Sequence, residues 1–247
     1  MTTYEETVFD QLKSWQQKIQ KNPSFTDKLS KRIQDKMNGI IPEKVHQAIT
    51  YTIEKMFKVM LYGAEYVTGD LPDGDATLLW REAYIKQSIK DYQKTAGVEG
   101  AVSGAGGILL GIADFPVLIG IKLKLLFEIS RMYGYDVSDY RERLFMLYVF
   151  QLAFSSQQHR LHTYKIIAGW QAYADLLPKD PEAFDWRSFQ QEYRDYIDIA
   201  KMAQLIPVIG AAVGAVANYK LIEKLGETAM NCYRMRKLDE HLRLENK

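Results

Sequence analysis

The chain has 247 residues, of which 47% are hydrophobic and 26% are charged, a composition typical of a folded protein rather than a disordered one. The formal net charge is +1, so no overall field would attract nucleic acid, and we expect no nucleic-acid partner. A single cysteine excludes an intrachain disulfide and a cysteine-rich metal site. The N-terminus lacks the basic and apolar regions of a secretory signal, so we expect a cytoplasmic protein.

The first third of the chain shows the apolar spacing of amphipathic helices. Thr3 and Glu6 have the spacing of a capping box, which predicts the start of the first helix. Pro23 and Gly39 are expected to end the first and second helices, and Pro42 to begin the third. Residues 11–36 carry seven basic and two acidic residues, which indicates either a solvated helix face or a face turned toward an anionic membrane.

Two apolar segments rich in glycine are the most unusual feature of the sequence, at residues 97–135 and 206–218. Glycine costs up to ~1 kcal/mol relative to alanine inside a helix, so its repeated use needs a structural return. Spacings of four residues place small side chains on one helix face, where two backbones can approach closely. We therefore predict a central glycine-rich helical hairpin, with these candidate functional residues: Gly104, Gly107, Gly111, Asp114, Pro116, Pro207, Gly210, Gly214 and Asn218.

Neither segment has the length of a clear membrane span, which needs ~20 predominantly apolar residues. The first is uncharged over the 14 positions from Gly100 to Ala113 and is then interrupted by Asp114. The second is uncharged over 18 positions, residues 202–219, but contains Pro207 and Asn218. A buried hairpin in a helical bundle is the leading interpretation, and shallow or conditional membrane insertion is the alternative.

The remainder of the chain also follows a helical pattern. Asp139 and Asp185 are placed to cap two helices, residues 155–158 are a candidate break, and a C-terminal helix is expected to extend through Leu238. No run shows convincing strand alternation. The sequence thus predicts an all-α bundle of about nine helices in a single domain, residues 1–247.

Asp114 is the first candidate for a functional group, because an acid within an apolar run is costly unless it is capped, paired or functional. One interpretation is an N-cap before Phe115-Pro116, with a hinge at that point. The other is a site for a cation or for a basic group of a partner, with Asn218 as a bridge. His159 and His162 share a helix face and are weak metal candidates without an identifiable third ligand, so we expect neither a metal nor a cofactor.

The two glycine-rich segments resemble those of the EcsC family. The resemblance is carried by residues 104–116, by Tyr133-Gly-Tyr-Asp136, by residues 41–46, and by residues 206–218 with the helix that follows them. It implies a protein encoded beside the ATPase and membrane subunits of the Ecs ABC transporter in Firmicutes. The family's own biochemical role is not established, so the resemblance assigns no catalytic residue.

Three functional hypotheses follow. The first is a non-enzymatic accessory protein, peripheral to the inner face of the cell membrane, with ABC transporter subunits or membrane lipid as partners. The second is a hydrolase-like or metal-binding enzyme with a pocket near Asp114 or His159 and His162. The third is a carrier of lipid or of a small amphiphile. The sequence does not indicate an oligomeric state.

Overall fold

The computed structural model describes residues 2–20, 43–62, 76–105, 107–155, 157–196 and 211–245. Within these ranges the chain forms nine α-helices and one short 3-10 helix and contains no strand, which confirms the predicted all-α bundle. The predicted second helix lies outside the described residues. The helices are α1 (Thr3–Gln20), α3 (Glu43–Tyr62), α4 (Leu78–Ala105), α5 (Gly107–Met132), α6 (Tyr140–Phe154), α7 (Gln157–Ala168), α8 (Trp170–Asp175), η2 (Pro181–Ala183), α9 (Trp186–Tyr196) and α11 (Ala211–Glu245).

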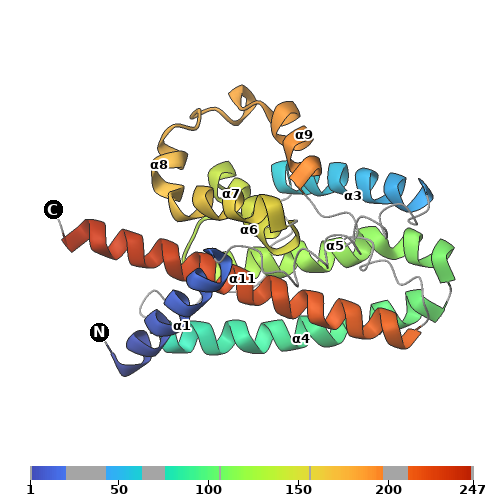
Figure 1. The fold of residues 1–247 in the computed structure, drawn as a ribbon, viewed down its shortest axis with the longest axis horizontal. Helices are drawn as coiled ribbons and strands as arrows, with labels where there is room; N and C mark the ends of the chain where they lie inside the picture. The colour runs from blue at the N-terminus through green and yellow to red at the C-terminus, as the bar shows by residue number, and fades with distance from the viewer. Residues whose placement is uncertain are drawn as a thin grey trace.

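Three long helices, α4, α5 and α11, run along the length of the molecule (Figure 1). α4 packs against both α5 and α11, and its pairing with α11 is the most extensive in the structure. Ile89 lies beside Gly226, and Gly97 lies beside Ala215, so α4 and α11 are antiparallel. α3 packs along α5, while α1 crosses α11 and α4 near the chain termini (Figure 1).

The close approach of α4 and α11 depends on one glycine. A Cβ atom built on Gly226 would stand 2.5 Å from Cδ1 and 2.6 Å from Cγ1 of Ile89, well inside van der Waals contact. The side chain of Ile89 therefore fills the space that a larger residue at position 226 would need. This glycine lies outside the two segments that the sequence pattern emphasises.

α6 forms the interior of the other half of the bundle. Its residues from Glu142 to Phe154 are all buried. α3 and α9 cover it with an aromatic cluster in which Phe57 contacts Phe189 and Tyr193, with ring centroids 5.5 and 5.1 Å apart. Such offset and edge-to-face contacts add to the hydrophobic burial that holds these helices together.

Local signals placed several helix ends correctly. Asp139 accepts a hydrogen bond from the backbone N–H of Arg141 at the start of α6, and Asp185 accepts one from Ser188 at 3.0 Å at the start of α9. The predicted break at residues 155–158 is shorter in the structure, where α6 ends at Phe154 and α7 begins at Gln157. The first capping box is shifted by one residue from the prediction: the Thr2 hydroxyl accepts from the N–H of Glu5, and Glu5 accepts from the N–H of Thr2 at 2.7 Å. The shift occurs because Thr3 already lies within the helix.

Candidate functional site

The predicted glycine positions that the structure describes lie at one end of the bundle. Gly104 is in the last turn of α4, Gly107 and Gly111 are in the first turns of α5, and Gly214 is in the first turn of α11. These three helix ends converge at the right of Figure 1, away from the chain termini. Pro207 and Gly210 lie outside the described residues. We call this region the glycine-rich end and define it as residues 95–105, 107–121 and 211–219.

The glycine-rich end exposes apolar side chains on all three of its helices. We call them the apolar cap: Val98 and Val102 on α4, Val117 on α5, and Val216 and Tyr219 on α11. Their exposed fractions run from 43% for Tyr219 to 64% for Val98. A single exposed apolar residue is ordinary, but several grouped at one end of a bundle indicate a surface that contacts something other than water.

Asp114 and Pro116 lie inside α5, not at its start. The helix runs without interruption from Gly107 to Met132, so the predicted N-cap at Asp114 and the predicted hinge at residues 114–116 are wrong. Asp114 is half-buried, and Pro116 is exposed. A proline removes one helical hydrogen bond, but here its ring points to the surface, and the apolar packing of Phe115 and Leu118 holds the helix together.

Asn218 is fully buried, and its partner is a residue that sequence reasoning missed. The ammonium group of Lys122 on α5 donates to Oδ1 of Asn218 on α11 at 3.2 Å and to the carbonyl of Leu118 at 3.2 Å. Lys122 is itself fully buried, and this burial lowers its pKa to about 7. Within the described ranges no carboxylate lies within ion-pair distance of Lys122, so an amide and a carbonyl oxygen are what solvate it.

A second buried group joins α4 to α11 near the other end of the bundle. Arg234 binds Glu82 through both its Nε and Nη2 atoms, with Nε 2.7 Å from Oε1. The hydroxyls of Tyr4 and Tyr133 donate to the same carboxylate at 2.6 and 2.9 Å. Burial would raise the pKa of Glu82, but the hydrogen bonds from Arg234, Tyr4 and Tyr133 hold it below its ordinary value. The carboxylate of Glu82 thus joins α4 to α1, to α11 and to the residue that directly follows α5.

A third buried polar group is centred on the carboxylate of Glu142 on α6. It pairs with Arg236 of α11 and accepts hydrogen bonds from Ser130 at 2.7 Å and from Tyr233 at 2.6 Å. The Arg236 guanidinium also stacks over the ring of Tyr135, 3.8 Å from its centroid. The buried acids at positions 82 and 142 are thus occupied by interhelix contacts, which gives them a structural role.

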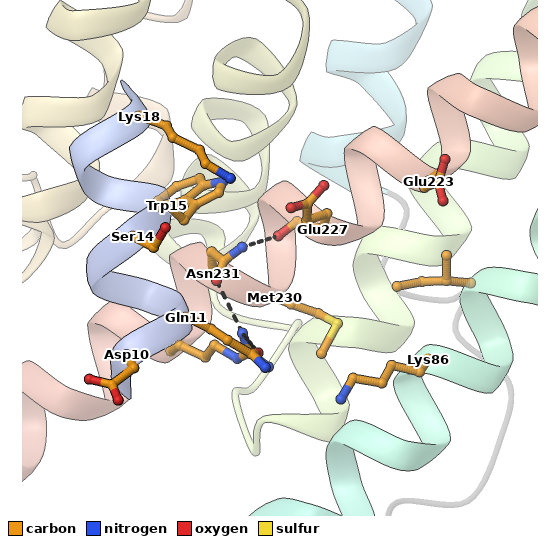
Figure 2. A pocket seen from close by; sticks show the side chains of 12 residues that line it. Asp10, Gln11, Ser14, Trp15, Lys18, Lys86, Glu223, Glu227, Met230 and Asn231 are labelled. Atoms are coloured by element: carbon orange, nitrogen blue, oxygen red, sulfur yellow. Dashed lines mark hydrogen bonds between the residues drawn. The ribbon is translucent and has the colours of Figure 1, made fainter. Parts of the chain in front are cut away.

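A groove of about 650 Å³ lies between α1, α4 and α11. Figure 2 shows Lys18 and Trp15 of α1 on one side, Glu227 and Asn231 of α11 opposite them, and Lys86 of α4 farther along. The Asn231 amide donates a hydrogen bond to the carbonyl of Glu227 and accepts one from Arg234, so these polar groups of the groove lining are bonded to one another. Charges of both signs line this groove, unlike the closed apolar tunnel expected of an amphiphile carrier.

The two candidate metal ligands His159 and His162 both lie on α7. His162 Nε2 stands 3.8 Å from a carboxylate oxygen of Glu192 on α9, and both side chains are about half exposed. Over the described part of the chain, no three His, Cys, Asp or Glu side chains gather closely enough to hold a metal ion.

Comparison with known proteins shows similarity over almost the whole chain. The model of the EcsC protein family matches residues 6–238. The chain is 44% identical to Protein EcsC of Bacillus subtilis (strain 168) over 226 residues, which is 92% of this chain and 93% of that protein. It is 26% identical to the uncharacterized protein YdbA of the same organism over 264 residues, covering 98% and 97% of the two chains. No solved structure matches. Each helix within the described ranges is too short or too polar to traverse a bilayer.

Proposed function

The chain belongs to the EcsC protein family, and from this premise we propose that it is a non-enzymatic accessory protein at the inner face of the cell membrane, where it works with an ABC transporter. The observation that carries the proposal is the apolar cap. A water-exposed end with valines on three converging helices is a natural contact surface for a membrane or for a membrane-embedded subunit.

The buried polar groups support a structural rather than a catalytic design. Glu82 and Glu142 are bound by arginine and tyrosine side chains from neighbouring helices. These contacts tie α4, α6 and α11 into one body behind the cap. An accessory protein requires such a body, because a docking surface binds more tightly when it is rigid before contact.

The test is fractionation and co-purification of the intact chain from cells with and without the transporter. We expect the protein in the membrane fraction, together with transporter subunits, and we expect less of it there when the transporter is deleted. A double variant of the cap, Val98→Ser with Val216→Ser, should reduce recovery of the subunits. Leu176→Ser is the matched control, because Leu176 is 85% exposed and lies on the connection after α8. A protein that stays wholly in the soluble fraction and recovers no membrane subunit would overturn the proposal.

A further inference from the structure

The lysines nearest the apolar cap have a regular placement. Lys94 precedes Val98 by four residues on α4, Lys220 follows Val216 by four on α11, and Lys124 follows Val117 by seven on α5. All three lysines are exposed. At 1.5 Å per residue, the separations along the helices are about 6, 6 and 10 Å. We call these three residues the lysine collar.

The end of the bundle beyond the collar carries few charges. The glycine-rich end as defined above contains two charged side chains, Glu99 and Asp114, and both are acids. Its remaining residues are apolar, small or uncharged. The boundary between this region and the charged remainder of the bundle therefore coincides with Lys94 on α4 and Lys220 on α11, whereas on α5 it falls at the buried Lys122, two residues before Lys124.

We propose that the glycine-rich end inserts into one leaflet of an anionic lipid bilayer, with the apolar cap among the acyl chains, Lys94 and Lys220 at the phosphate level, and Lys124 farther from the bilayer centre. This proposal rests on the proposed function, which places the protein at the inner face of the cell membrane. What it adds is that the chain binds lipid directly, without any protein partner.

The dimensions of α4 and α11 fit a single leaflet. Eleven residues separate Lys94 from the end of α4 at Ala105, and nine separate Lys220 from the start of α11 at Ala211, which correspond to about 16 and 14 Å of helix; Lys124 lies farther back, about 26 Å from the start of α5. The hydrocarbon region of a bilayer is about 30 Å thick, so one leaflet offers about 15 Å. The chain reverses direction between α4 and α5, which begins at Gly107, so both helices of this hairpin remain on one side of the membrane.

The charges fit an anionic surface rather than a neutral one. Lysine ammonium groups on flexible stems can reach phosphate while the apolar part of each side chain lies along the helix. Each lysine near an anionic leaflet contributes a favourable electrostatic interaction that weakens with added salt. Glu99 opposes insertion, because it is a partly exposed acid on α4 beside Val98. Removing the negative charge of Glu99 should therefore strengthen binding to anionic lipid, which provides a second test.

The experiment is flotation of the purified full-length chain with vesicles of phosphatidylcholine alone or mixed with phosphatidylglycerol. We expect binding to the mixed vesicles that falls with salt. The triple variant Val98→Ser, Val102→Ser and Val216→Ser should lower this binding tenfold or more, whereas Leu176→Ser should not change it. Glu99→Gln should raise it severalfold.

A second set of variants tests the collar. Changing Lys94, Lys124 and Lys220 together to Gln should reduce binding to mixed vesicles at least tenfold and abolish most of the salt dependence. The matched control changes three exposed lysines elsewhere, Lys58, Lys165 and Lys179, to Gln, with a much smaller effect expected. Circular dichroism of every variant checks that it is folded.

The inference is overturned if the wild-type chain does not bind anionic vesicles, or if the cap and collar variants bind as well as their controls. Its failure can be told apart from failure of the proposed function. A chain that co-purifies with transporter subunits but ignores vesicles docks on protein, and the accessory role stands without lipid insertion. A chain that binds vesicles but recovers no subunit retains the lipid site and loses the transporter role.

Discussion

Lys122 is the residue whose position is hardest to reconcile with hydrophobic burial alone. Removing an ammonium group from water is costly, and the cost is met here by two neutral oxygens, those of Asn218 and Leu118. The charged form is therefore penalised in the folded chain but not in the unfolded chain. This difference makes the stability of the protein depend on pH in a direction that is unusual for a bundle rich in ion pairs.

The direction of this pH dependence follows from the number of protons that each state binds. The unfolded lysine keeps its proton up to a pKa near 10.5, whereas the folded one releases it near 7. Between these values the unfolded state binds more protons, so stability rises with pH; below pH 7 the penalty is fully present. For one titrating group, the free energy of unfolding can change by at most about 1.4 kcal/mol per pH unit.

We therefore predict that Lys122→Met removes a rise of about 2 kcal/mol in the free energy of unfolding between pH 7 and pH 9. Urea unfolding at a series of pH values measures it. Lys124→Met is the matched control, because Lys124 is exposed on the same helix and should leave the rise unchanged. Parallel pH profiles for the wild type and the Lys122 variant would contradict the prediction.

At the scale of the helix, glycine serves two different purposes in this chain. Gly226 is required by the close contact between α11 and Ile89 of α4, whereas a Cβ at Gly120 on α5 would meet nothing within 4 Å. The first position has no room for a side chain, and the second has only the conformational cost of glycine. The two sites therefore respond oppositely to the same substitution.

Gly226→Ala should lower the free energy of unfolding by about 1–3 kcal/mol, because the added methyl group overpacks the α4–α11 contact. Gly120→Ala should raise it by up to about 1 kcal/mol, since alanine is the better helix former. Thermal or urea unfolding of both variants checks this. In the Ile89→Ala background the Gly226→Ala change should cost much less; equal costs in the two backgrounds would show that Ile89 is not the cause.

The elements that the sequence predicted well are those with local signals. Asp139 and Asp185 bind amides two or three residues away, so their roles can be read from a short window. α4 continues through Gly97, although glycine commonly ends helices, because packing against Ala215 of α11 outweighs the modest cost of glycine. A tertiary contact carries α4 past this glycine, and no local window contains that contact.

The candidate site was only partly visible for the same reason. The glycines and Asn218 stand out as composition, and the structure does bring Gly104, Gly107, Gly111 and Gly214 to one end. In the sequence Lys122 only interrupts an apolar run, and its contact with Asn218, 96 residues later, has no local signal. The pairing of Glu82 with Arg234 joins residues 152 positions apart and has no local signature.

At the scale of the whole molecule, the single cysteine reports on the integrity of the fold. Cys232 lies in the middle of α11 and is fully buried, and burial raises the pKa of its thiol well above the ordinary value. Thiol reagents attack the thiolate, so the native chain presents neither the exposure nor the ionisation that the reaction needs.

We predict that an aromatic disulfide reagent at pH 8 modifies Cys232 slowly in the native protein and rapidly, with one thiol per chain, in concentrated guanidinium chloride. The labelled fraction after a short pulse should follow the helical signal through a urea titration, because both report the same cooperative opening. Rapid labelling in native buffer with full helicity retained would show that α11 opens locally.

α11 also gives the molecule a mechanical property. It is a single helix of 35 residues that carries Val216 of the apolar cap near one end and Arg234 and Arg236 toward the other. About 30 Å of helix separates Val216 from Arg236. Any tilt imposed on α11 at the cap acts through this lever on the carboxylates of Glu82 and Glu142, so the force that anchors one end is resisted by ion pairs at the other.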